Sequence, residues 1–136
     1  MSDPSQVRAD LKARTDVIEE AYEFFLAYAS QGLPTDANTS HPIRDHLRKF
    51  DQSLTGLGAF FLECATQIGV GDLTPYRAFV GVIERDARDA QAAIQLVLAQ
   101  PAIGSQTIDN LNASIHVRAL LTDLFLIEEI LSSLMR

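Results

Sequence analysis

Three stretches of this sequence repeat apolar residues in alternating steps of four and three, and this spacing constrains the fold more than any other feature. The repeat is unbroken over residues 43–68 and recurs over residues 76–97 and 117–134. A sustained period of about 3.5 residues is typical of helices that pack through one apolar seam at roughly 20° from antiparallel. The spacing therefore predicts long helices packed side by side. The expected seam residues are Ile43, Leu47, Phe50, Leu54, Leu57, Phe61, Cys64 and Ile68; Tyr76, Val80, Ile83, Ala87, Ala90, Ile94 and Val97; and Val117, Leu120, Leu124, Ile127, Leu131 and Leu134.

Glycine and proline divide the chain into four segments of similar length, with breaks at residues 32–34, 69–71 and 101–104. Asp3 before Pro4 is a typical helix start, and Gly32 suits the end of the same helix. We therefore predict an all-α fold with helices at about 4–31, 42–68, 75–100 and 106–134. Short connections make consecutive helices antiparallel, so the expected architecture is an up-down-up-down four-helix bundle. It would occupy residues 1–136 as one domain.

The charge balance disfavours nucleic acid as the main partner. Eighteen acidic residues against eleven lysines and arginines give a net charge of −7, which repels a phosphate backbone. The one basic stretch contains His41, Arg44, His46, Arg48 and Lys49, and a solvated helix face is its simplest interpretation. No apolar run reaches the roughly 18 residues of a membrane span, and the first residues lack a secretion-signal pattern. We expect a cytoplasmic protein that does not cross a membrane.

The residue types that perform catalysis or bind metals form no recognisable set. The sequence contains no Glu-x-x-His pair, which di-metal bundles require on facing helices. Its single cysteine, Cys64, occupies a seam position, where a thiol behaves as a small apolar group. We therefore expect no metal, no cofactor and no enzymatic activity.

One turn of the second predicted helix resembles histidine phosphotransfer bundles. In that family an exposed histidine is followed three positions later by lysine, as His46 is followed here by Lys49. The resemblance implies a phosphoaccepting His46. However, the position after the lysine is small in that family and is Phe50 here. The alternative is an ordinary surface histidine beside Asp45.

The first and last predicted helices carry more apolar residues than one seam needs, and a helix that is apolar on two faces is buried on two faces. We therefore expect either a homodimer or a protein partner on these helices, because large exposed apolar patches are rare on monomers. A wide core stripe is the alternative. The candidate interface residues are Tyr22, Phe24, Leu26, Leu121, Phe125, Leu126 and Ile130.

Glycines occur inside the predicted helices at Gly56, Gly58 and Gly81, and each costs about 1 kcal/mol relative to alanine. Folding the second helix onto the third places Gly58 level with Glu84, and Gly81 level with Phe61. The expected compensation is close helix approach, with a phenylalanine fitted against a glycine. A kink or a small pocket at mid-height is the alternative.

Arg14 occupies an inward position of the first helix under either choice of its apolar stripe. Because a buried charge needs compensation, Asp123 and Glu84 at the same height are its expected partners. The structural interpretation is an internal ion pair. The functional one is a pocket for a small anionic ligand, formed by Arg14, Gly58, Gly81, Glu84 and Asp123.

Overall fold

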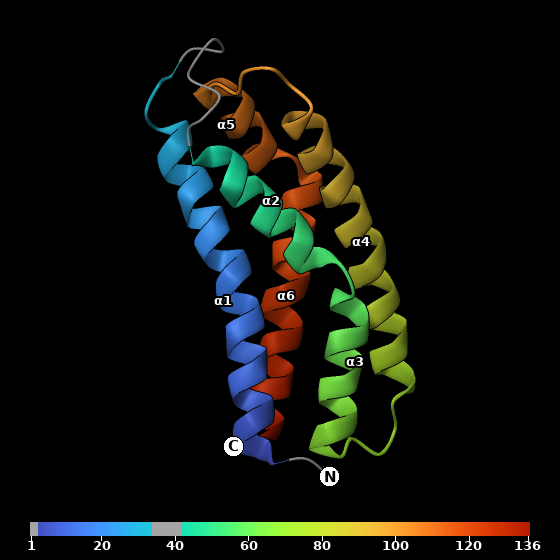
Figure 1. Ribbon diagram of the computed structural model, residues 1–136. Helices are drawn as coiled ribbons and strands as arrows, with labels where there is room; N and C mark the ends of the chain where they lie inside the picture. The colour runs from blue at the N-terminus through green and yellow to red at the C-terminus, as the bar shows by residue number, and fades with distance from the viewer. Residues whose placement is uncertain (1–2, 34–41) are drawn as a thin grey trace.

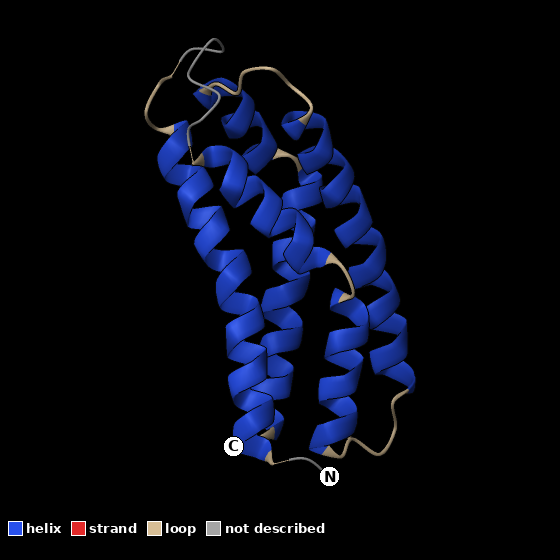
Figure 2. Cartoon of the chain, viewed as in Figure 1, coloured by secondary structure: helices blue, strands red, loops and turns tan. Residues whose placement is uncertain are grey.

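The computed structural model describes residues 3–33 and 42–136, and this part of the chain forms helices and no strand. The predicted all-α class is therefore confirmed (Figure 2). His41 lies outside the described residues. The helices are α1 (Pro4–Ala29), α2 (Ile43–Leu54), α3 (Leu57–Ile68), α4 (Thr74–Leu98), α5 (Ser105–Ala113) and α6 (Ile115–Leu134).

The helix predicted over residues 42–68 is in fact two helices, α2 and α3. Thr55 is extended, with φ −70° and ψ 127°, and Gly56 adopts φ 71° in the left-handed region. Glycine takes that conformation without the steric cost that a Cβ imposes, so Gly56 serves to break the helix and not to bring two helices together. Leu54 and Leu57 on either side remain buried. The apolar seam therefore continues across the break, which is why its spacing did not indicate one.

The helix predicted over residues 106–134 is also divided, into α5 and α6. Ser114 between them is extended, with φ −63° and ψ 142°. Its hydroxyl oxygen accepts a hydrogen bond from the backbone N–H of Val117 at 3.4 Å. A serine that accepts such a bond is a good helix N-cap, so Ser114 begins a new helix where continuity was predicted. Six described helices thus stand where four were expected.

The helices lie along one another around a shared apolar core (Figure 1). α4 packs against α6 and against α3, while α1 packs against α2 and α5. The end of α6 lies beside the first turns of α1, where Arg8 Nη2 donates to the carbonyl of Met135 at 2.7 Å. None of the described helices has the length and apolar character needed to cross a membrane.

Three arginines each donate to backbone carbonyls at the end of a different helix. Arg8 reaches the end of α6, Arg14 the end of α2, and Arg44 the end of α4. Those helices have no basic residue in their own last turns. The last carbonyls of a helix lack partners within it and carry partial negative charge. Each of these arginines therefore supplies hydrogen-bond donors to the end carbonyls of a neighbouring helix.

Candidate functional site

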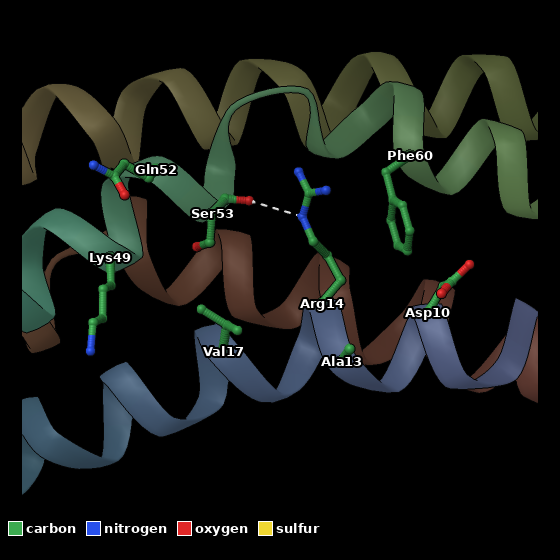
Figure 3. Close-up of a pocket in the computed structure, with 8 residues that line it drawn as sticks. All are labelled: Asp10, Ala13, Arg14, Val17, Lys49, Gln52, Ser53 and Phe60. Carbon is green, nitrogen blue, oxygen red and sulfur yellow. Dashed lines mark hydrogen bonds between the residues drawn. The ribbon is translucent and has the colours of Figure 1, made fainter. Parts of the chain in front are cut away.

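A groove of about 630 Å³ opens where α1 faces the break between α2 and α3. We call it the Arg14 groove; Figure 3 shows its lining side chains. α1 contributes one wall, α2 the facing wall, and α3 the aromatic ring at one end. The lining residues are Asp10, Ala13, Arg14, Val17, Lys49, Gln52, Ser53 and Phe60.

Among the described residues, Arg14 donates to backbone carbonyls and forms no ion pair with a carboxylate. Its Nε donates to the carbonyl of Ser53 at 3.4 Å, and its Nη2 donates to that of Thr55 at 2.8 Å. The guanidinium also lies over the ring of Phe60, 5.1 Å from the ring centre. The predicted ion pair of Arg14 with Asp123 or Glu84 is wrong. The helix break, which the sequence pattern concealed, supplies carbonyl partners that a continuous helix would have kept for itself.

The remaining residues of the predicted ligand pocket do not gather around Arg14. Gly58 faces Glu84, as predicted from their equal heights along the bundle. A Cβ placed on Gly58 would lie 2.5 Å from Glu84 Cγ. These two residues line a separate hollow between α3 and α4. A Cβ placed on Gly81 would have Arg85 of the same helix as its nearest side chain, at 3.6 Å. The expected fit of Phe61 against Gly81 is therefore wrong. Within the described residues, Arg14 lines the Arg14 groove, whereas Gly58 and Glu84 line the hollow between α3 and α4.

Asp123 pairs with an unexpected partner, the carboxyl group of Asp86 across the α4–α6 contact. Its Oδ2 atom is buried and has no hydrogen-bond partner among the described residues. Burial, followed by the hydrogen bond and the charge of Asp86, raises the pKa of Asp123 to about 7. The Asp123 carboxyl group therefore keeps its proton to a higher pH than an ordinary aspartate. In the sequence, Asp86 directly precedes the seam residue Ala87, and Asp123 directly precedes the seam residue Leu124. This position beside the core could have indicated that the two carboxyl groups lie close together.

A second, apolar hollow of about 320 Å³ lies between α4 and α6; we call it the α4–α6 groove. Leu126 and Ile130 on its α6 side are 52% and 40% exposed. Leu134, one turn beyond Ile130, is also exposed. The lining residues are Pro75, Tyr76, Phe79, Leu126, Ile127 and Ile130.

The other candidate interface residues do not share this surface. Leu121 is only 6% exposed, so it belongs to the core and was wrongly placed at an interface. Tyr22 and Phe24 are half-buried. Leu26 and Phe125 are exposed, but Leu26 lies near the end of α1 that is remote from the last turns of α6. α1 and α6 therefore do not form one continuous apolar face.

His46 has a setting unlike that of an exposed phosphoacceptor. Its ring is half-buried and stacks on the ring of Phe24, with centroids 3.8 Å apart. Burial and the nearby charge of Lys49 lower the pKa of His46. One face of the imidazole is covered, so this geometry does not favour phosphotransfer. Cys64 is buried as expected, and burial raises the pKa of its thiol to about 11.

Asn112 in α5 carries a buried amide that lacks hydrogen bonds. It is 6% exposed, and neither side-chain atom has a partner among the described residues. Because an unsatisfied buried amide opposes folding, we expect Asn112→Leu to raise the free energy of unfolding by about 1 kcal/mol. Urea unfolding would measure it, with the exposed Asn110→Leu as the control. A less stable Asn112→Leu variant would show that the amide contributes favourably.

Comparison with protein-family models, curated proteins and solved structures finds no match for this chain. The function must therefore be argued from the two grooves.

Proposed function

We propose that this chain is a non-enzymatic interaction protein that forms a homodimer through the α4–α6 groove. The observation that carries the proposal is the group of exposed leucine and isoleucine side chains beside that groove. Exposed apolar surface of this kind is usually covered in a working protein, because its burial removes water from apolar atoms.

The arrangement of this surface favours a second copy as the occupant. Leu126, Ile130 and Leu134 follow one another at intervals of four, so they form one stripe along α6. A two-fold interface needs one patch to serve on both copies. Here the stripe adjoins the groove, so the stripe of each copy can fill the groove of the other.

The dimer proposal revises the expected surface from helices α1 and α6 to helices α4 and α6. We also propose that α2 with α3, and α5 with α6, each act as one bent helix, so that the fold is an antiparallel four-helix bundle. The apolar seam that continues across the α2–α3 break supports that view for α2 with α3. For α5 with α6, the support is the burial of Leu111 and Val117 on either side of Ser114. We place this function in the cytoplasm, as the sequence suggested.

Sedimentation equilibrium or light scattering from about 1 to 100 μM tests the dimer directly. We expect the wild-type mass to rise to that of two chains. Ile130→Glu should weaken association at least tenfold, about 1.4 kcal/mol, because it introduces a charge into an apolar contact. The matched control is Leu96→Glu, since Leu96 is 67% exposed on α4 and does not line the groove. A wild-type monomer throughout this range, or equal effects of the two variants, would contradict the proposal.

Salt distinguishes an apolar interface from an ionic one. Each copy carries a net charge of −7, so two copies repel at low ionic strength. Added salt screens that repulsion, and the dimer should therefore become tighter. Dissociation by salt would instead indicate contacts between opposite charges.

A further inference from the structure

We propose that the break between α2 and α3 is a conformational switch, in which Arg14 and Gln91 hold apart two helices that can join into one. The break consists of Thr55, which is extended, and Gly56, which is left-handed. Arg14 reaches it from α1 and Gln91 from α4. The inference is independent of self-association, because neither side chain lines the α4–α6 groove.

The sequence across the break is compatible with a continuous helix. The apolar residues on its two sides follow one another at steps of four, three and four, as Phe50, Leu54, Leu57 and Phe61. One continuous helix would therefore place these side chains on the same face. They are buried in the broken form as well. Gly56 tolerates both forms, since it has no Cβ to oppose a positive φ. The same core residues can thus serve either conformation.

The break releases backbone carbonyls that side chains of the neighbouring helices then bind. In a continuous helix, the carbonyls of Asp51, Ser53 and Thr55 would accept from the N–H groups four positions later. Here Arg14 donates to the Ser53 carbonyl at 3.4 Å and to the Thr55 carbonyl at 2.8 Å. Gln91 Nε2 donates to the Asp51 carbonyl at 2.9 Å and to the Thr55 hydroxyl at 3.1 Å. Two side chains therefore take the place of three helical hydrogen bonds.

The N–H groups at the start of α3 gain no comparable partners. No side chain of the described residues caps this helix start. The N–H of Phe60 donates to the carbonyl of Gly56 at 3.0 Å, so the N–H groups of Leu57 and Ala59 lie in the first turn, before the helical hydrogen bonds begin. If the two side chains were removed, the carbonyls at the end of α2 and these N–H groups would both lack partners. A continuous helix would pair them with one another.

Hollows on both sides of the break leave room for this change. The Arg14 groove, about 630 Å³, lies on the α1 side, and Figure 3 shows the Arg14 side chain directed at the break. A hollow of about 330 Å³ lies on the α4 side and is lined by Thr55, Gly56 and Gln91, among others. Because the backbone of the break is not closely packed on either side, it can change conformation without overlapping core side chains.

The test is the double variant Arg14→Met with Gln91→Met, which removes the donors and keeps unbranched side chains of similar length. The matched control is Arg8→Met with Gln95→Met. Arg8 also donates to a helix-end carbonyl, but at the end of α6. Gln95 also donates to Asp51, but to its carboxylate and not to its backbone carbonyl. The control thus removes the same residue types and leaves the carbonyls of the break with their partners.

Backbone NMR and amide hydrogen exchange distinguish a switch from a purely structural role of the two side chains. In the double variant, the Cα chemical shift of Thr55 should move from the extended range to the helical range. The amides of Leu57 and Ala59 should exchange about tenfold more slowly, because each gains a helical acceptor. The control variant should change neither measurement. Loss of merely structural contacts would instead make both amides exchange faster.

The proposal is overturned if Thr55 stays extended in the double variant, if the two amides exchange faster, or if the control changes equally. Gly56→Ala decides the matter if the double variant does not fold, because alanine opposes the left-handed conformation. It should shift Thr55 and slow the amides of Leu57 and Ala59 in the same direction. An extended Thr55 or faster exchange in Gly56→Ala would then overturn the proposal. None of these outcomes depends on the dimer mass, so the two proposals fail separately.

Discussion

Asp123→Asn is expected to raise the free energy of unfolding at pH 8 by about 2 kcal/mol and to leave it unchanged near pH 4. In the wild type, Asp123 faces Asp86, and its buried Oδ2 has no partner among the described residues. Two ionised carboxylates at this position repel one another. The uncharged asparagine amide cannot ionise, and its nitrogen can donate to Asp86.

The sign of the pH dependence follows from the raised pKa of Asp123. That pKa is about 7 in the folded protein against 3.8 for an ordinary aspartate, so the folded state holds a proton that the unfolded state loses first. Stability contributed by this group therefore falls as the pH rises from about 4 to about 7. A full shift of this size corresponds to about 4 kcal/mol at 1.36 kcal/mol per unit. Because Asp123 is only partly buried, solvent screening reduces the effect to about half of that.

Urea unfolding at intervals between pH 4 and pH 8 would measure this difference. The advantage of Asp123→Asn should grow steadily over that range. Asp89→Asn is the matched control, since Asp89 is exposed on α4 and the same charge is removed. If the free energies of unfolding of Asp123→Asn and the wild type stay parallel over the whole range, the ionisation of Asp123 does not affect stability.

Gly58→Ala is expected to lower the free energy of unfolding by about 2 kcal/mol, although this substitution usually stabilises a helix. The new Cβ would lie 2.5 Å from Glu84 Cγ and 2.9 Å from Val80 Cγ1. Real Cβ atoms do not approach other carbon atoms so closely, so α3 and α4 must move apart. Glu84 can rotate toward solvent, but Val80 is buried in the core and cannot.

Gly81→Ala is the control of opposite sign. Gly81 lies inside α4, and its Cβ would meet only Arg85 of the same helix, at an ordinary contact distance of 3.6 Å. This variant should be more stable by about 1 kcal/mol, the usual gain for alanine in a helix. Adding Glu84→Ala to Gly58→Ala should recover part of the loss, because one of the two clashes is removed. Thermal or urea unfolding of the four proteins would measure these effects, and equal stabilisation by both alanines would refute the close approach at Gly58.

The core was the most predictable part of this protein. Leu47, Ile83 and Ile94 are fully buried, as the alternating spacing predicted. Burial of one helix face depends on which residues recur every three or four positions, and that is a property of the local sequence. The prediction of burial was less accurate at helix ends. Leu134 is a predicted seam residue, but it is exposed on the last turn of α6.

The two helix breaks could not be derived from the same spacing. At Gly56 the backbone leaves the helical conformation without interrupting the apolar repeat. Ser114 precedes Val117, the first residue of the last repeat, so that repeat carries no information about this break. Gly56 was read as a glycine within a helix because glycine is compatible with both conformations at modest cost. Which conformation is adopted depends on the elements packed on either side.

The candidate sites depend on those breaks and on the relative heights of the helices. Arg14 is half-buried, as its position in the first helix predicted, but the Ser53 and Thr55 carbonyls that accept its hydrogen bonds are available only because α2 ends there. Asp86 and Asp123 are 37 positions apart in the chain (123 − 86), and they meet because α4 packs against α6 at that height. The amino-acid order thus specified helical class and core composition, through interactions between near neighbours in the chain. The partners of the polar groups came from packing between distant segments, since a hydrogen bond or a contact between two carboxyl groups requires them to meet within a few ångströms.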